Sequence, residues 1–518
     1  MKKIIIAILL ITTGFGCSNL DLAPLDARSE LTFWKTDEDA NIFLNSMYAD
    51  IWNADAYLYF NALSDDAYTR REDYRNIGNG NYDASNGVVT GAWSSRYEGI
   101  RRANIFMNNI DNVEDISESN RESYKAQARF IRALHYFYLV ELYGDVPLVI
   151  DEISIDESLQ LVRTDKSIVT DFIYTELATA INNLPETDEP GRITKDAGIA
   201  FKSKVHLYNE DYQSTVNLAG ELIGEYSLFP DYEGLFQPQN ENNDEIILSL
   251  QYIPIDREHN NQYSLIPPSQ SGYANFSPLQ ELVDSYLTID GKEITDASSG
   301  YDENNPYVNR DPRLEATILY NGHSWTDFDG SQITIDTSPG AEPNGYNYSS
   351  NTTQTGYYVA KYFDINARNQ TNSGLDLILI RYAEVLLNYA EAKNELGSFT
   401  EQDWDMTIKL IRERAGLIGS ALDFPGGGQA SLRTIIRNER RVELAFEAGH
   451  RFFDIRRWRL SETVNSGWLH GFKTDESLED DGYIRVDFRT FDPAKDYLWP
   501  IPQSERDLNK NLTQNPNW

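Results

Sequence analysis

The sequence predicts an all-α fold. About four tetratricopeptide-like helical hairpins form a scaffold, and a loop-rich lobe carries a few short strands. Two segments, 195–226 and 382–416, show the small-residue and aromatic spacing of a tetratricopeptide hairpin. They lie far apart in the chain, so the hairpins do not form a continuous solenoid. The stretch between them, 229–375, is rich in Asn, Gly, Ser, Pro and Tyr, a composition typical of turns and loops.

The first residues show the pattern of an export signal. Lys2 and Lys3 precede an apolar run that is too short to span a bilayer, and small residues lead to Cys17. Cys17 is the single cysteine of the chain, so it cannot form an intramolecular disulfide, and its position after the apolar run favours lipid attachment. An ordinary secretory signal with an incidental cysteine is the alternative. We expect a signal peptide at 1–16 and a lipidated tether at 17–35.

An N-terminal helical region is predicted over 36–228. Apolar residues recur there every three or four positions, and Gly or Pro residues follow the periodic segments, as expected at helix ends. Helices are expected at 36–50, 93–110, 121–143 and 167–184, followed by the hairpin at 195–226. The stretch 50–91 is polar and rich in Tyr, Asn, Asp and Gly, so we expect a long functional loop there.

The insertion at 229–375 is expected to supply the few strands. Ile246–Leu250 is a short apolar run, and 317–320 is a second strand candidate that leads into an Asn-Gly dipeptide, a strong turn signal. Trp325 stands just beyond this predicted turn.

The C-terminal region, 376–518, contains the most regular charge pattern. A helix is predicted at 377–396, and in a later one Glu439, Glu443 and Glu447 repeat at every fourth position among closely spaced arginines. Arginine forks pair well with carboxylates that are partly buried. We interpret the pattern as an ion lattice between helices, because patterned helix charges are mostly structural. An anion or sugar-acid site is the functional alternative.

Composition and missing motifs exclude several classes of function. The formal net charge of −36 argues against nucleic acid or an anionic membrane surface as a partner. The sequence contains no HExxH, GxSxG, P-loop or GxGxxG motif, so we expect no bound cofactor, while the abundant acids leave a glycosidase pair of carboxylates open. No two of the six histidines share a predicted helix face, and therefore no metal site is expected.

Aromatic residues on loops remain as candidates for function. The chain has 32 Tyr and 9 Trp, more than its core requires. A sugar ring can stack on such a ring while Arg, Asn or Asp binds its hydroxyls. Packing in the core or in loops is the alternative for each aromatic residue. Two regions supply suitable groups: the first holds Asp65, Asp66, Arg71, Tyr74, Arg75, Asn76, Trp93 and Arg96, and the second holds Tyr301, Tyr307, Asn309 and Trp325.

Several motifs give the chain a family resemblance. They are Cys17 followed by NLDLAPLD, then AQARFIRALHYFYLVELYGDVPLV, RYAEVLLNYAEAKNELG, IIRNERRVELAFEAGHRFFDIRRW and YLWPIPQSERDLNKNLTQNPNW. Together they span essentially the whole mature chain, which resembles the RagB/SusD family of outer-membrane nutrient-binding lipoproteins of Bacteroidetes. The resemblance implies a non-enzymatic protein that is anchored by lipid at the cell surface. It also implies capture of an oligosaccharide or polysaccharide and delivery to a SusC-like TonB-dependent transporter, which docks on the helical scaffold.

The resemblance also implies which residues bind the glycan. In starch-binding members of the family an aromatic arc with Arg, Asp and Asn holds the ligand. By position relative to the motifs, the arc and its hydroxyl-binding partners correspond here to Trp93, Trp325, Tyr301, Arg75, Asp66 and Arg96. Those members have Asn one helical turn after the first Trp, where this chain has Arg96, so the glycan is expected to differ.

Two other functions and two classes of glycan stay open. The chain could be a tetratricopeptide-type adaptor lipoprotein that binds protein or peptide. It could also be a surface glycoside hydrolase, which needs a pair of carboxylates. The negative net charge favours a neutral polysaccharide. Uronates or sulfates are favoured instead by the arginines near Trp93, which are Arg70, Arg71, Arg75 and Arg96.

Overall fold

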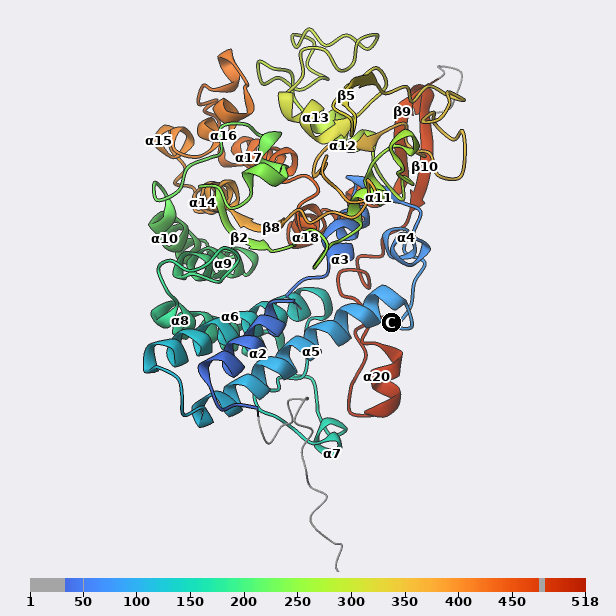
Figure 1. The fold of residues 1–518 in the computed structure, drawn as a ribbon. Helices are drawn as coiled ribbons and strands as arrows, with labels where there is room; N and C mark the ends of the chain where they lie inside the picture. Colours follow the sequence, from blue (N-terminus) through green and yellow to red (C-terminus); the bar gives the residue numbers. More distant parts are fainter. Residues whose placement is uncertain (1–32, 50, 475–479) are drawn as a thin grey trace, which may run out of the picture.

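The computed structural model describes residues 33–49, 51–474 and 480–518. The predicted signal peptide, Cys17 and most of the predicted tether lie outside these described residues. The described chain is mainly helical and carries a few short strands (Figure 1), which confirms the predicted fold class.

A curved stack of long helices forms the scaffold. Its members are α2 (Asp37–Ala49), α5 (Gly87–Asn109), α6 (Glu118–Tyr143), α8 (Lys166–Asn183), α9 (Lys195–Tyr208), α10 (Tyr212–Leu222), α14 (Tyr382–Glu395) and α17 (Gln429–Glu443). From α5 onward each helix packs against the next one in this series. In Figure 1 the stack rises from α5 and α6 near the bottom, through α8, α9 and α10, to α14 and α17.

Local sequence signals begin and end these helices. Ser117 and Thr194 cap α6 and α9, where their hydroxyls accept hydrogen bonds from backbone N–H groups of the first turn. Gly144 follows α6 at a φ of 71°, a left-handed conformation that glycine adopts without a steric penalty. The hairpin predicted at 195–226 is confirmed as the adjacent pair α9 and α10.

The described chain also contains shorter α-helices. They are α3 (Ala54–Tyr59), α4 (Glu72–Gly78), α7 (Ile155–Ser158), α11 (Asn261–Leu265), α12 (Gln280–Ser285), α13 (Pro312–Thr317), α15 (Glu401–Asp405), α16 (Ile408–Ala415), α18 (His450–Arg457), α19 (Ser461–Val464) and α20 (Gln503–Leu508).

The strands of the described residues form five two-stranded antiparallel sheets. The pairs are β1 (Ala67–Thr69) with β3 (Phe276–Pro278), β2 (Ile246–Leu250) with β8 (Leu377–Arg381), β4 (Ile318–Leu319) with β7 (Tyr358–Val359), β5 (Ser324–Thr326) with β6 (Gln332–Thr334), and β9 (Gly467–Lys473) with β10 (Tyr483–Arg489). Loops, β5, β9 and β10 gather in the lobe at the top and right of Figure 1.

The prediction of a long loop over 50–91 is wrong. This stretch contains α3, β1 and α4, and its acidic residues Asp65 and Asp66 are buried. Arg451 lies 2.8 Å from Asp65, and Arg441 lies 2.7 Å from Asp66. The segment around these two acids is polar without being exposed, because arginines from the distant C-terminal region neutralise Asp65 and Asp66.

One helix prediction also needs correction. Residues 377–381 form β8 instead of the first turn of a helix, because they are buried throughout and pair with β2. The strand predicted at 317–320 is confirmed as β4, and the Asn-Gly turn joins it to β5. β4 pairs with β7, and β5 pairs with β6.

A buried ion network joins the scaffold to the lobe. Glu443 of α17 receives three guanidinium groups, from Arg313 of α13 at 2.8 Å, from Arg381 of β8 at 2.6 Å and from Arg414 of α16. Burial opposes the charge of Glu443, but the three arginines outweigh it and hold the pKa of this carboxyl far below its ordinary value.

Acids on either side of Glu443 in the sequence extend this network. Glu439 of α17 lies 2.7 Å from Arg313 and 2.7 Å from Arg412. Glu447 lies 2.7 Å from Arg381, but it stands beyond the end of α17 and does not continue the helical repeat as predicted, because the chain turns at Phe446 with a φ of 64°. The pairs confirm that the charge pattern is structural, since all three carboxylates contact buried arginines.

We predict that Glu443→Gln lowers the free energy of unfolding by about 3–5 kcal/mol, because three buried guanidinium groups lose their shared counter-charge. A chemical denaturation series measures the change. Asp405→Asn is the matched control, since Asp405 makes an exposed i,i+4 pair with Lys409 at 3.1 Å, and its loss should be below about 0.5 kcal/mol. Equal losses in the two variants would contradict the stabilising role of the network.

Candidate functional site

A pocket in the loop-rich lobe, which we call the tyrosine pocket, has a cavity volume of about 580 Å³. The loop 301–309, the residues that follow β4 and the β9–β10 sheet line it, together with the first residue of α12. Its aromatic side chains are Tyr301, Tyr307, Tyr320, Tyr357, Phe472 and Tyr483.

Two of these rings form a stacked pair. The ring centroids of Tyr307 and Tyr320 lie 3.9 Å apart, and their planes are inclined by 19°. A third ring, that of Tyr301, lies 5.4 Å from the buried guanidinium of Arg310. Arg310 also donates a hydrogen bond of 2.7 Å to the carbonyl of Pro306, so it supports the ring and holds the loop in place.

A chain of hydrogen bonds orients the phenol groups. Tyr307 donates to the hydroxyl of Tyr357 at 3.3 Å, and Tyr357 donates to Oε1 of Gln280 at 2.6 Å. Burial raises the pKa of Tyr307, Tyr320 and Tyr483 to about 12. These phenols therefore keep their protons at neutral pH, and the pocket presents uncharged rings and hydroxyl groups.

The remaining lining is polar and balanced in charge. The side chain of Asp302 orders the loop by accepting the backbone N–H of Asn304 at 3.0 Å and the amide of Asn305 at 2.7 Å. Both asparagines line the pocket. The charged lining residues are Glu303 and Lys473, whose side chains lie 3.4 Å apart. Flat rings, amides and a neutralised charge pair suit an uncharged ligand with many hydroxyl groups.

The structure places one predicted aromatic residue, Tyr301, in this pocket and the other two elsewhere. Trp93 of α5 is 3% exposed and packs on Tyr97 with ring centroids 4.9 Å apart. Trp325 of β5 is 7% exposed, and its Nε1 donates to Oε1 of Gln270 at 2.9 Å. Both indoles are packed inside the protein, which leaves little ring surface for a sugar.

The predicted polar residues have partners within the protein. Asp66 is buried against Arg441. Arg96 is buried as well and donates to the carbonyl of Ile51 at 2.6 Å, while Arg75 is half-buried and donates to a tyrosine hydroxyl at 3.2 Å. Trp93, Arg96 and Tyr301 also line three different cavities, so the structure does not assemble the predicted residues into one surface.

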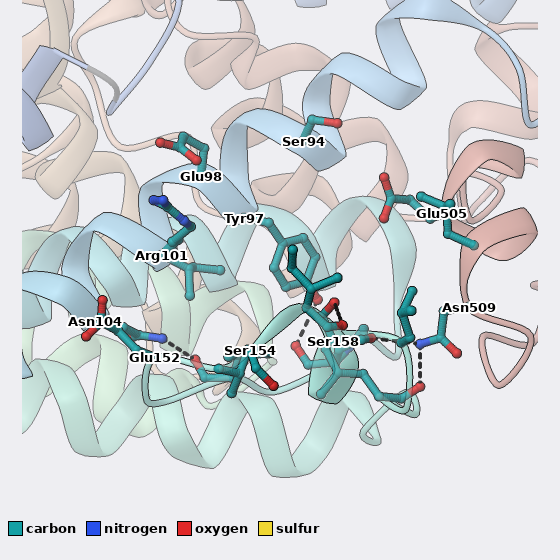
Figure 2. A pocket seen from close by; sticks show the side chains of 18 of the residues that line it. Ser94, Tyr97, Glu98, Arg101, Asn104, Glu152, Ser154, Ser158, Glu505 and Asn509 are labelled. Atoms are coloured by element: carbon teal, nitrogen blue, oxygen red, sulfur yellow. Dashed lines mark hydrogen bonds between the residues drawn. The ribbon is translucent and has the colours of Figure 1, made fainter.

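A second cavity, which we call the α5–α7 groove, lies beside the scaffold and has a volume of about 560 Å³. Figure 2 shows side chains of α5, of the segment around α7 and of α20 facing it. Ile155 and Leu508 at its border are 80% and 70% exposed. The charged residues around the groove are Glu98, Arg101, Asp151, Glu152 and Glu505.

Two negative findings apply to the residues that the structure describes. Among them, no group of three or more His, Cys, Asp or Glu side chains is arranged to hold a metal ion. The described helices also include none that combines the length and the apolar character needed to cross a membrane.

Comparison with known proteins identifies the family. The SusD family model matches residues 237–518, more than half of the chain. The chain belongs to the SusD family. A second family model, described as starch-binding and associating with the outer membrane, matches residues 27–207 of this SusD-family protein.

Similar proteins match the SusD-family chain over nearly its whole length. A SusD-like protein of Formosa agariphila is 27% identical, and the match covers 99% of this chain and 98% of the relative. The crystal structure of a SusD-like carbohydrate binding protein from Bacteroides fragilis has 28% identity and a TM-score of 0.84, and covers 93% of this chain and 100% of that one. A laminarin binding SusD-like protein has 24% identity and a TM-score of 0.68, and the match covers 94% of this chain and 100% of that one. These matches confirm the SusD-like fold.

We predict that the Tyr307–Tyr320 stack stabilises the tyrosine pocket. A double-mutant cycle with Tyr307→Ala and Tyr320→Ala should give a coupling of about 0.5–1.5 kcal/mol in the free energy of unfolding, the range for stacked aromatic pairs. The control cycle combines Tyr320→Ala with Tyr389→Ala of α14. Because these two residues do not touch, their losses in the free energy of unfolding should add. Additive losses in both cycles would contradict the stacked arrangement.

Proposed function

We propose that this protein is a non-enzymatic, cell-surface lipoprotein that captures a neutral oligosaccharide or polysaccharide. In this proposal it delivers the glycan to a SusC-like TonB-dependent transporter of the outer membrane. The tyrosine pocket carries the proposal. Its rings offer flat apolar faces to sugar C–H groups, and the amides of Asn304 and Asn305 can donate and accept hydrogen bonds with hydroxyls.

The charges of the pocket support a neutral ligand. Lys473 is the one cation among the described lining residues, and Glu303 already lies 3.4 Å from it. A uronate or sulfate group would have to compete with Glu303 for this lysine. The net charge of −36 adds a general repulsion of polyanions.

The same lining supports binding without hydrolysis. Glycoside hydrolases place two carboxyl groups about 5–10 Å apart on either side of the scissile bond. Glu303 is the single carboxylate among the described residues that line the tyrosine pocket, so the pocket lacks the second acid. This argument favours capture over catalysis.

Membrane attachment and transporter docking are assigned to other parts of the chain. Cys17, outside the described residues, is the proposed lipid attachment site. The α5–α7 groove on the helical scaffold is the proposed docking surface for the transporter. Its exposed Ile155 and Leu508 stand among mostly acidic residues, which suits a partner segment with apolar side chains flanked by Lys or Arg.

The glycan proposal predicts binding to a neutral glucan such as laminarin or soluble starch and no binding to the anionic polymer alginate. The Tyr301→Ala/Tyr483→Ala double variant should weaken binding at least about tenfold, or about 1.4 kcal/mol, because two ring faces are lost. Affinity electrophoresis and titration calorimetry on the mature protein measure the change.

The matched control for this pair is Tyr263→Ala. Tyr263 is an exposed tyrosine that stacks on Tyr273 at 5.6 Å, outside the tyrosine pocket, and its loss should leave binding unchanged. Loss of binding in the Tyr263→Ala control would place the site elsewhere. So would a folded Trp93→Ala/Trp325→Ala variant that loses binding while the Tyr301→Ala/Tyr483→Ala variant keeps it. Release of reducing sugar by the wild-type protein would support the hydrolase alternative.

The docking proposal predicts that an Ile155→Asp/Leu508→Asp variant recovers several-fold less transporter from solubilised outer membranes, because each added carboxylate must be desolvated in the interface. Quantitative mass spectrometry of the co-purified TonB-dependent transporter measures the loss. Ile418→Asp is the control, since Ile418 is 55% exposed and lies outside the groove. Undiminished recovery of the transporter by the double variant would exclude the groove as the docking surface.

A further inference from the structure

His470 of β9 lies between two carboxylates beside the tyrosine pocket. Its Nδ1 is 2.8 Å from Oε1 of Glu281 on α12, and its Nε2 is 3.2 Å from Oδ2 of Asp480. Carboxylates only accept hydrogen bonds, and a neutral imidazole carries a single N–H. Both contacts are hydrogen bonds at the same time only when the ring is a doubly protonated imidazolium.

The backbone of His470 strengthens the link to α12. The backbone N–H of His470 also donates a hydrogen bond to the Glu281 carboxylate. The nitrogen lies 2.9 Å from Oε1 and 3.2 Å from Oε2. One acidic side chain of α12 therefore holds both the main chain and the ring of one residue of β9.

The elements joined in this way are walls of the tyrosine pocket. Gln280, which precedes Glu281, accepts the hydrogen bond of Tyr357. On β9, Phe472 and Lys473 follow His470 closely and line the pocket. Tyr483 opens β10 and pairs in register with Lys473. The contact between α12 and β9 thus joins two sides of the pocket, next to the hydrogen bond of 2.7 Å that the Phe472 N–H donates to the carbonyl of Thr355.

We propose that His470 is a positioning residue for glycan binding. Its imidazolium ties the β9–β10 sheet to α12 and so fixes Phe472, Lys473 and Tyr483 at the wall of the tyrosine pocket. The proposal rests on the glycan-binding function and adds to it a dependence of affinity on pH.

The charged groups around His470 favour its protonated form. The hydrogen bond to Glu281 is the largest cause that raises the pKa of His470 above its ordinary value of 6.5, partial burial opposes it, and Asp480 adds to the increase. On the adjacent strand, Arg485 pairs with His470 in register and shares the Asp480 carboxylate. The ring of Tyr483, on the same strand, lies 6.3 Å away and stays uncharged at neutral pH.

The pKa values of the other five histidines shift in the opposite direction. Burial lowers the pKa of each of them, which are His135, His206, His259, His323 and His450. A histidine signal that titrates above the ordinary value is therefore expected to belong to His470.

The direction of the pH effect follows from the raised pKa. The link is complete at about pH 6, where His470 is charged, and is lost as pH rises through its raised folded-state pKa. Glycan affinity should fall between about pH 6 and pH 8.5 by up to about fivefold, the range that partly exposed ion pairs contribute. In His470→Gln the affinity should be low and independent of pH over this interval.

The experiment combines three measurements on the mature protein. Nitrogen-15 NMR of labelled histidine side chains gives the pKa of His470. Hydrogen exchange of the peptide that contains β9, corrected for intrinsic rates, reports how firmly the sheet is held at each pH. Calorimetry gives the affinity for laminarin or starch, whichever binds.

The variants separate positioning from general stability. Glu281→Gln keeps a hydrogen-bond acceptor but removes the charge, so it should lower the pKa of His470 and raise exchange in β9. His206→Gln is the matched control, because His206 pairs with Asp211 at 2.9 Å on the scaffold, far in sequence from the pocket walls, and should leave the exchange of β9 and the affinity unchanged.

Two results would overturn the proposal. One is an ordinary or lowered pKa for His470, and the other is exchange of β9 with the same pH dependence in wild type and His470→Gln. Failure of the wild type to bind any neutral glucan at any pH would instead reject the glycan proposal, while the NMR and exchange measurements still decide whether His470 positions the sheet.

Discussion

The shared ion pairing of Glu443 is the interaction on which the arrangement of the chain depends. The three arginines that contact it come from α13 within the insertion, from β8 just after the insertion and from α16, which follows α14. Each of these ions is costly to bury alone, and the costs are offset only when all reach their places. The network therefore holds the lobe in one position on the scaffold.

This constraint reaches the tyrosine pocket through short lengths of chain. Arg313 anchors α13 to α17, and β4 begins directly after α13 and leads to Tyr320. Just before α13, Arg310 supports the ring of Tyr301. Two sides of the pocket thus lie a few residues from the buried network. The third side, the β9–β10 sheet, is held on α12 by His470, and it is held elsewhere by buried Arg489 of β10, which donates to the carbonyl of Ala62 at 3.0 Å.

Sequence patterns identified the parts of the chain that obey a local period. The hairpin of α9 and α10 and the acidic face of α17 were predictable, because helical spacing places their residues on one face. Tyr301 and its loop were also indicated, since aromatic residues stand there among amides. Tyr357 and Tyr483 carried no such signal, because they reach the pocket by the folding of distant segments. Trp93 lies in α5 at the helical spacing of a core residue, and it packs into the core instead of facing a ligand.

The most direct test of this account is a crystal structure of the mature protein with a neutral oligosaccharide that it binds. The account predicts a sugar ring in the tyrosine pocket, in contact with Tyr301 or Tyr483, and hydroxyl groups within hydrogen-bond distance of Asn304 or Asn305. A sugar bound in the α5–α7 groove or beside Tyr263, with the tyrosine pocket empty, would contradict it.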